Sequence, residues 1–428
     1  ATTAAGVEGA WRVMLDPLDY APAHAPQTMI VRGATHTVRL SDVLIGEVWV
    51  CSGQSNMRFT LGRKAEPRDD QAPLLFSESL ANCAQPGLRL LNVSGGTPAD
   101  RKWAACAPDT AAAFSAIGYF YGAALAQARD VPIGLVDLGR GGAAIRSFIP
   151  LEAFNARSEF TRAYPPEQRP GATTGAVFAK DVQPFAPFAV RGVLWYQGEG
   201  DAARAALYSE MLRVLIAEWR RAFETPELPF VVVQLPPWER RRTDPPRTSI
   251  GIKWAELRAA QAEVANADPH LALVVIADCG ERLDIHPRRK REVGERLARV
   301  IRAEVYGETI TRHGPELIST DVRPDVIVLT FAHTEGGLFA RGGQLDDLEV
   351  AGEDGKFVAA TATVTGHNQI TVQRPPGGAA TFVRYAWRDY FEPSLFNGDG
   401  WPAAPFRTDA FPFTTAVAGE TARDPGRP

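Results

Sequence analysis

The chain has 428 residues, 45% hydrophobic and 22% charged, which is an ordinary globular composition with room for two or three domains. Its formal charge of −4 argues against a nucleic-acid binder, for which a basic surface would be expected. No stretch approaches the roughly 18 consecutive apolar residues of a membrane-spanning helix.

Hydrophobic periodicity divides the chain into three parts and a tail. Residues 1–40 predict a partial β segment with short strands at 11–15, 28–31 and 37–40. In residues 41–312, apolar strands alternate with amphipathic helices, which indicates an α/β fold with a parallel sheet covered on both faces. Residues 313–416 carry short strands between Gly, Asp and Asn turns and predict an antiparallel β-domain, followed by a tail at 417–428.

Within the α/β region the expected strands are 44–50, 133–138, 190–196, 229–235 and 271–277. The expected helices are 111–128, 203–223, 253–266 and 289–306. A segment rich in Pro, Ala and Gly, about 150–188, predicts a surface insertion beside the site. The β-domain strands are expected at 326–331, 347–350, 357–363, 369–373 and 381–386.

The first functional signal is a serine that follows a buried strand. The apolar run 44–50 leads into Cys-Ser-Gly-Gln-Ser-Asn-Met, where Gly53 allows a sharp turn and Ser55 is the presented serine. Open α/β sheets bind their ligands at the carboxyl ends of strands. Ser55 is therefore a candidate nucleophile.

Two later loops supply the partners that a serine nucleophile needs. The strand 190–196 ends in Gln197-Gly198-Glu199, and the strand 271–277 precedes Asp284-Ile285-His286. Histidine accepts a proton near neutral pH, and an acid beside it fixes its tautomer and stabilises the imidazolium. We therefore expect His286 to be the base for Ser55.

These blocks resemble the sialate O-acetylesterase-like branch of the SGNH hydrolases. The resemblance rests on Gly-Gln-Ser-Asn-Met, Trp-Tyr-Gln-Gly-Glu and Asp-Ile-His-Pro, with further similarity at 114–120, 132–142, 383–387 and 405–409. It spans about 9–409. It implies a flavodoxin-like, three-layer SGNH-hydrolase sheet with an accessory antiparallel β-domain. It also implies that a longer β-domain precedes residue 41, so that 1–40 is only part of it.

The resemblance leaves the triad acid open. Asp284 lies two residues before His286, whereas many SGNH enzymes place the aspartate three before, where this chain has Leu283. Asp-x-His is the usual form in this branch, so Asp284 is the expected acid. Glu199 is the alternative, because some related acetylesterases resemble this chain in having a glutamate there, and a backbone carbonyl is the third option.

The tetrahedral oxyanion needs hydrogen-bond donors. The candidates are the Ser55 N–H, the N–H of Gly142 or Gly141, and the Gln197 side-chain amide. The alternative is that the two glycines form a plain turn and that Gln197 is a buried structural amide. A metal site at Asp278, Asp284 and His286 is not expected, since a second histidine or further clustered ligands are missing.

Three arginines depart from the family pattern and bear on the substrate. Arg58 stands where the branch commonly has glutamate, Arg140 where it often has tryptophan, and Arg146 follows the Gly-Gly turn. Such arginines could bind a substrate carboxylate bidentately. The alternative is a surface charge or a pair with Glu47, Glu199 or Asp201.

The sequence therefore predicts a serine esterase that removes O-acetyl groups from carbohydrates and needs no cofactor. The alternatives are an acetylesterase for plant cell-wall glycans (xylan, xyloglucan or pectin) and a carbohydrate-binding protein with a decayed site.

The partner of the protein is expected to be the acetylated carbohydrate, without nucleic acid or membrane, and the oligomeric state of the protein stays open. We expect a secreted or periplasmic protein, although residues 1–6 lack signal-peptide features. Cys83 and Cys106 could pair in an oxidising compartment.

Overall fold

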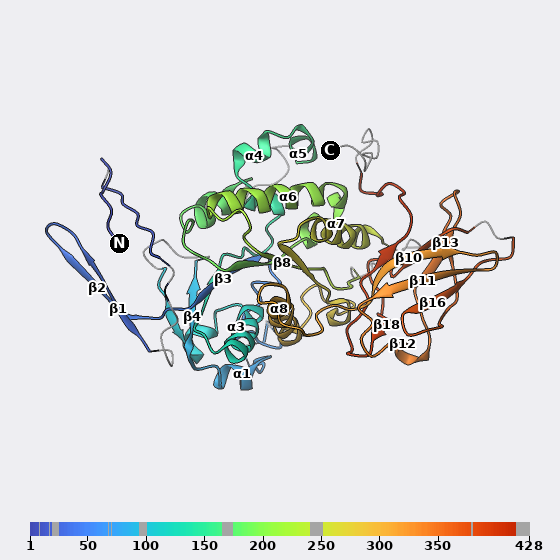
Figure 1. The fold of residues 1–428 in the computed structure, drawn as a ribbon, viewed down its shortest axis with the longest axis horizontal. Helices are drawn as coiled ribbons and strands as arrows, with labels where there is room; N and C mark the ends of the chain where they lie inside the picture. The colour runs from blue at the N-terminus through green and yellow to red at the C-terminus, as the bar shows by residue number, and fades with distance from the viewer. Residues whose placement is uncertain are drawn as a thin grey trace.

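The structure is a computed structural model that describes residues 1–416 except 8, 17, 19–24, 67, 70, 94–100, 165–173, 240–250 and 378–379. The expected tail, 417–428, lies outside the described residues. Its centre is a seven-stranded sheet with helices on both faces, joined to a β-rich unit formed by the last hundred or so described residues (Figure 1). The expected α/β SGNH-type fold with an accessory β-domain is confirmed.

The central sheet is parallel except at one edge, where β5 runs antiparallel to β4. Its order is β5 (Ala104–Cys106), β4 (Gln85–Asn92), β6 (Ile133–Asp137), β3 (Glu47–Gly53), β7 (Gly192–Tyr196), β8 (Phe230–Val233) and β9 (Leu271–Val274). The chain places β4, β5 and β6 on one side of β3, with β6 next to it, and then crosses to β7 on the other side. The carboxyl end of β3 is therefore at the topological switch point, where such sheets bind ligands.

Helices α3 (Ala116–Arg129) and α8 (Lys290–Glu304) cover one face, and α6 (Ala205–Ala222) and α7 (Lys253–Ala267) cover the other (Figure 1). The predicted apolar stripe of α8 is buried, including Val293 and Leu297. Gly294 allows α3 and α8 to approach closely, because a Cβ there would lie 2.6 Å from the Cβ of Phe120.

Shorter helical segments lie in the connections. They are α1 (Ser77–Ala81), α2 (Pro108–Ala111), α4 (Leu151–Asn155), α5 (Ser158–Ala163), the 3₁₀ turns Ile145–Phe148, Glu199–Arg204, Ala277–Cys279 and Arg341–Gly343, and a π turn at Phe178–Val182. The segment expected as a surface insertion contains α4 and α5. Its Phe154 and Phe160 are buried, pack against each other with ring centroids 5.4 Å apart, and belong to the central hydrophobic core.

The C-terminal unit is made of antiparallel strands, as predicted. One sheet has the order β10 (Glu316–Val322), β11 (Val326–Ala332), β16 (Gln369–Gln373) and β15 (Ala362–Val364). The second sheet has the order β14 (Val358–Ala359), β13 (Leu348–Ala351), β17 (Phe382–Tyr385) and β19 (Phe406–Arg407). A third pairs β12 (Leu338–Ala340) with β18 (Leu395–Asn397). Alternating apolar residues such as Ile327, Leu329 and Val383 form a separate core.

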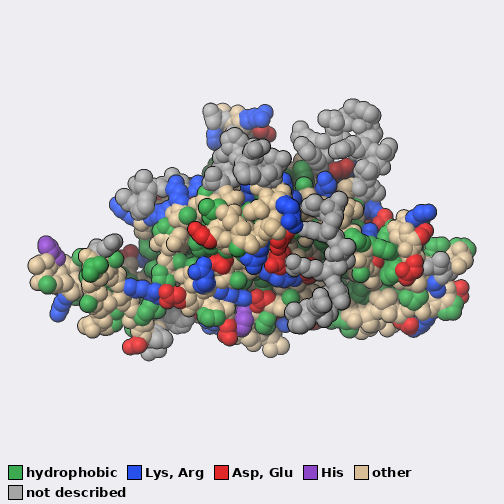
Figure 2. Space-filling view, turned by 90° about the horizontal axis from the view of Figure 1, so that it is seen from above, with side chains coloured by type: hydrophobic (Ala, Val, Ile, Leu, Met, Phe, Trp, Pro, Cys, Tyr) green, Lys and Arg blue, Asp and Glu red, His purple; other side chains and the backbone are tan. Residues whose placement is uncertain are grey.

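An N-terminal arm, residues 27–43, extends from the body as a hairpin of β1 (Gln27–Arg32) and β2 (Thr37–Val43) (Figure 1). Hydrophobic side chains lie on the surface of the described structure (Figure 2). On the hairpin, the Val38 side chain is 52% exposed. On the face that Figure 2 shows, acidic and basic side chains are interspersed over the body.

Several local expectations were wrong. Residues 11–15 were expected to form a strand and do not. Conversely, β4 and β5 were not predicted, because Pro86-Gly87 near the start of β4 indicates a turn. The helix expected from residue 111 begins at Ala116, since the Ser115 hydroxyl caps it by accepting the N–H of Gly118.

The four cysteines are buried free thiols. The expected burial of Cys51 and Cys279 is thus confirmed. Cys83 and Cys106 do not form a disulfide, and the Cys106 thiol instead donates to the Cys83 carbonyl at 3.2 Å.

Candidate active site

The three sequence motifs meet at the carboxyl edge of the central sheet. Gly53 ends β3 opposite Tyr196, which ends β7, and the N–H of Gln54 donates to the Tyr196 carbonyl at 3.0 Å. Gly53 has φ +132°, and a Cβ there would lie 2.0 Å from the Tyr196 oxygen. Only glycine fits this approach, and it lets the chain turn out of the sheet immediately before Ser55.

Ser55 and His286 are in hydrogen-bond contact although 231 residues separate them. The Ser55 Oγ lies 2.9 Å from the His286 Nε2. Ser55 stands in a tight turn closed by the Arg58 N–H to the Gln54 carbonyl, and His286 lies in the loop between β9 and α8. Burial lowers the pKa of His286, and the nearby charge of Lys290 lowers it further. A neutral imidazole at this distance can accept the serine proton.

Asp284 is the carboxylate beside the imidazole, although it is not hydrogen-bonded to the ring. Its Oδ1 lies 4.0 Å from the His286 Nδ1 and accepts the main-chain N–H of His286 at 2.9 Å. The Asp284 side chain is 46% exposed. The loop therefore curls enough to bring Asp284 alongside the histidine ring.

Glu199 lies on the interior side of the site and belongs to a buried polar network. Its Oε1 accepts the Asn56 side-chain N–H at 2.6 Å, and the same Asn56 nitrogen donates to the Ile285 carbonyl at 2.9 Å. Its Oε2 is buried with no hydrogen-bond partner among the described residues. Burial raises the pKa of Glu199 to about 7.

Lys290 completes this network from the first turn of α8. Its Nζ donates to the Asn56 Oδ1 and lies 4.9 Å from the centroid of the Phe59 ring. Burial lowers the pKa of Lys290 to about 7. Sequence reasoning missed both Asn56 and Lys290. The available signal was their position in the motifs, because Asn56 follows Ser55 and Lys290 lies four residues after His286.

Gln197 is fully buried and already bonded to protein groups. Its Nε2 donates to Asp201 Oδ2 at 2.6 Å and to Gln54 Oε1 at 3.1 Å, while its Oε1 accepts the Tyr208 hydroxyl at 2.9 Å. Asp201 Oδ2 also accepts the N–H of Ile145. Gln197 thus joins the loops that follow β3, β6 and β7.

The glycine pair stands in an open turn. The Ala143 N–H donates to the Arg140 carbonyl, and Gly142 between them has φ +70°. Both Gly141 and Gly142 are exposed, and a Cβ on either would meet nothing within 4 Å. The turn leaves space in front of its backbone.

The three arginines contact protein groups, and two form ion pairs other than those the sequence suggested. Arg58 lies 3.1 Å from the Asp137 carboxylate, where burial raises the pKa of Asp137 to about 6. Arg140 lies 2.6 Å from Asp181. The carboxylates of these two ion pairs are Asp137 and Asp181, and not the Glu47, Glu199 or Asp201 that the sequence suggested. Arg146 is buried, with its guanidinium 4.7 Å from the centroid of the Tyr164 ring.

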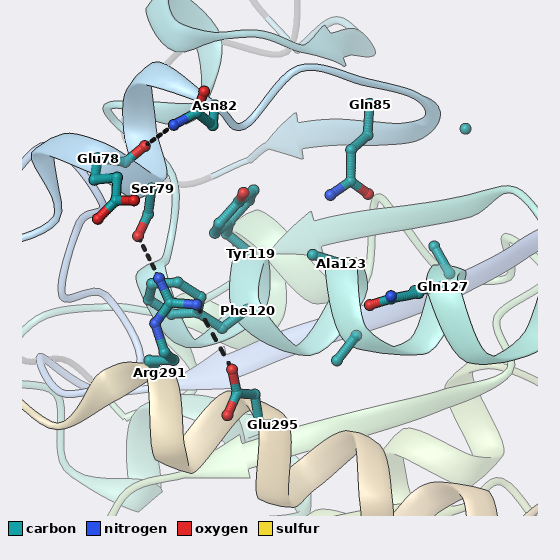
Figure 3. A pocket seen from close by; sticks show the side chains of 13 residues that line it. Glu78, Ser79, Asn82, Gln85, Tyr119, Phe120, Ala123, Gln127, Arg291 and Glu295 are labelled. Atoms are coloured by element: carbon teal, nitrogen blue, oxygen red, sulfur yellow. Dashed lines mark hydrogen bonds and ion pairs between the residues drawn. The ribbon is translucent and has the colours of Figure 1, made fainter.

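Hollows open on the described surface, and two of them bear on the site. The first, about 600 Å³, lies between α1, β4, α3 and α8, and in it Arg291 contacts Ser79 and Glu295 (Figure 3). Neither Ser55 nor His286 lines it. The second, about 1020 Å³, is lined by Glu199 and Ile285 and continues toward the β-domain.

Within the described residues, no cluster of three or more His, Cys, Asp or Glu side chains could hold a metal ion. Among the same residues, no helix has the length and apolarity needed to cross a bilayer.

Comparisons with known proteins define the class. Residues 45–303 match the carbohydrate esterase family of sialic acid-specific acetylesterases. The structure superposes on a carbohydrate acetylesterase from Xanthomonas citri with a TM-score of 0.79 and 31% identity, covering 94% of this chain and 89% of that one. The protein is thus a carboxylic ester hydrolase.

Curated relatives agree with this class. The sialate O-acetylesterase of Rattus norvegicus is 28% identical over 393 residues, or 77% of this chain and 70% of that protein. The sialate O-acetylesterase of Homo sapiens is 25% identical over 92% of this chain and 81% of its own. The chain belongs to the sialic acid-specific acetylesterase family of carbohydrate esterases.

Proposed function

We propose that the protein is a serine O-acetylesterase that acts on acetylated carbohydrates through Ser55 and His286. The observation that carries this proposal is the 2.9 Å contact between the Ser55 Oγ and the His286 Nε2 at the switch point of the sheet. It also argues against the decayed binding protein considered as an alternative, because the two groups keep the geometry needed for proton transfer.

In this mechanism His286 takes the Ser55 proton as the Oγ attacks the acetyl carbonyl. The tetrahedral oxygen is stabilised by the N–H groups of Ser55 and Gly142 and by the Gln197 amide. His286 then protonates the departing sugar oxygen, and a water that it activates releases acetate. Asp284 is the proposed acid beside the imidazolium, with Glu199 as the alternative. No step uses a cofactor.

The proposed role of Gln197 requires a small rearrangement. Its amide nitrogen currently donates to Asp201 and Gln54, so one of these bonds must yield to the oxyanion. Gly142 needs no such change, since its turn is open.

The decisive test is Ser55→Ala, with Ser52→Ala as a matched control. Ser52 is a buried serine on β3, three residues away, whose hydroxyl donates to the Leu138 carbonyl. We expect Ser55→Ala to lower the turnover of 4-nitrophenyl acetate by several orders of magnitude and Ser52→Ala to leave it near the parent. A folded Ser55→Ala protein within tenfold of the parent would exclude the mechanism.

For the substrate, we propose an acetylated sialate, as the names of the relatives suggest. The second candidate is a neutral acetylated glycan such as a plant cell-wall polysaccharide, favoured by the pairing of Arg58 and Arg140 with protein carboxylates. Arg58 and Arg146 are the residues proposed to bind the substrate carboxylate. Acetate release from free O-acetyl sialic acid and from acetylated xylan separates these candidates. A secreted or periplasmic location is part of the same proposal.

A further inference from the structure

A large cleft runs from the neighbourhood of Ser55 to the C-terminal β-domain. Its volume is about 1020 Å³, and its lining includes Glu199 and Ile285 at one end and Tyr390 at the other. Ile285 precedes His286, and Glu199 is bonded to Asn56, the residue after Ser55. Neither Ser55 nor His286 lines the cleft itself, but through Ile285 and Glu199 its end lies next to residues adjacent to that pair.

Aromatic side chains form the middle of the cleft. The rings of Trp238 and Trp254 have centroids 4.9 Å apart and are tilted by 44°. Trp254 donates its indole N–H to the Pro236 carbonyl, whereas the buried indole N–H of Trp238 has no partner among the described residues. The partly exposed ring of Trp238 therefore offers an apolar contact to a ligand in the cleft.

Charged pairs line the cleft beside these rings. Arg282 is bonded to Glu239 at 2.8 Å and lies 5.5 Å from the centroid of the Tyr390 ring. Arg388 pairs with Asp347 at 2.8 Å on the β-domain side. Such pairs hold carboxylate oxygens and guanidinium N–H groups in place, where they can bond to sugar hydroxyls.

The β-domain wall of the cleft is fixed to the catalytic body. Arg258 of α7, only 1% exposed, donates to the carbonyls of Arg388 and Asp389, and the Trp254 N–H donates to the Asp389 carboxylate at 2.8 Å. Glu256 of α7 accepts the hydroxyl and N–H of Thr415. This wall of the cleft is therefore pre-formed, and preformed clefts at domain interfaces are favoured ligand sites.

We propose that this cleft binds sugar units next to the acetylated one, so that the substrate is a glycan chain. This inference rests on the proposed esterase function and adds a binding site to it. Trp238 and Tyr390 contact the neighbouring sugars, and the charged pairs bond to their hydroxyls.

The test compares chain lengths at a constant acetyl position. Acetylated xylose against acetylated xylotetraose is the neutral series, and free O-acetyl sialic acid against O-acetyl sialyllactose is the anionic one. We expect kcat/KM of the parent to be about tenfold higher or more for the longer substrate in at least one series. Trp238→Ala and Tyr390→Ala should each bring that ratio close to one. Trp103→Ala, an exposed tryptophan that does not line the cleft, should keep it.

The unfolding temperature of each variant is measured to show that the variant is folded. If Trp238→Ala does not fold, Tyr390→Ala alone tests whether the cleft binds the neighbouring sugars. Equal kcat/KM for short and long substrates in both series, or a preference that survives both substitutions, would overturn the proposal. Calorimetric titration with deacetylated xylotetraose and with sialyllactose tests the cleft without catalysis. If the protein bound these oligosaccharides in a way that depends on Trp238 but hydrolysed no acetyl ester, the proposed esterase function would be refuted and the proposed glycan-binding cleft would stand.

Discussion

The two carboxyl groups around His286 differ in almost every physical respect. Asp284 is on the solvent side, nearly half exposed, and holds the histidine through its main-chain N–H. Glu199 is on the interior side, where burial raises its pKa to about 7 and Asn56 and Lys290 surround it. The comparison teaches that the carboxylate positioned beside the ring and the one with the strongly perturbed pKa are not the same residue.

Of the two carboxyl groups, Asp284 should show the larger effect of substitution, in the variant Asp284→Asn. Asparagine can still accept the His286 N–H, so the substitution removes the charge while keeping that bond. We expect kcat for 4-nitrophenyl acetate to fall roughly hundredfold or more with little change in KM, because the charge matters mainly when the imidazolium forms.

The control is Glu281→Gln, a carboxyl of the same loop that bonds to the Arg288 N–H. If Glu281→Gln lowered kcat as much as Asp284→Asn, the role of Asp284 would be to support the loop.

A smaller effect is expected from Glu199→Gln. Glutamine keeps an acceptor for Asn56, and among the described contacts Glu199 makes no hydrogen bond to the imidazole. We expect kcat to change by less than about tenfold. A loss larger than that of Asp284→Asn would transfer the acid role to Glu199.

The interior side should also control the pH profile. Because burial and Lys290 lower the pKa of His286, we expect kcat/KM of the parent to fall only below about pH 6.5. The charges acting on His286 are Lys290 and Arg63, which lower its pKa, and Asp284, which raises it. Lys290→Met removes one of the cations, so the acidic limb should move to higher pH. An unchanged limb would show that Lys290 does not act on the histidine.

The smallest expected effect is on stability. The pKa of Glu199 is about 7 in the folded protein and about 4.3 in the unfolded chain. The folded protein therefore loses stability as the pH rises from about 4.3 through 7, because only the folded state still binds the proton there. The unfolding temperature of Glu199→Gln should therefore decline less than that of the parent between about pH 5 and about pH 7. Parallel pH dependences in the two proteins would contradict the raised pKa of Glu199.

The parts of the fold that alternate regularly were predictable from the sequence. The apolar run of a strand such as β3 and the apolar stripe of a helix such as α8 can be recognised in the sequence itself. The carboxyl ends of parallel strands then meet at one edge of the sheet. Ser55 and His286 could therefore be placed together although they are far apart in the chain.

The contacts between patterned elements were not predictable. Lys290 reaches Asn56 across 234 residues, and no local pattern records that bond. The partners of Arg58 and Arg140 were missed for a similar reason, since Asp137 ends a strand and Asp181 lies in a π turn. Ion-pair partners depend on which loops the fold brings together, and periodicity does not contain that information.

The attachment of α7 to the β-domain has a consequence for engineering. Loss of the β-domain would leave the hydrogen bonds of Glu256 and Arg258 unmade, which costs about 1–3 kcal/mol for each polar group that remains buried. The two parts should therefore melt in a single transition. A chimaera that borrows a foreign β-domain must also borrow the first two turns of α7, which makes this helix the natural boundary for recombination.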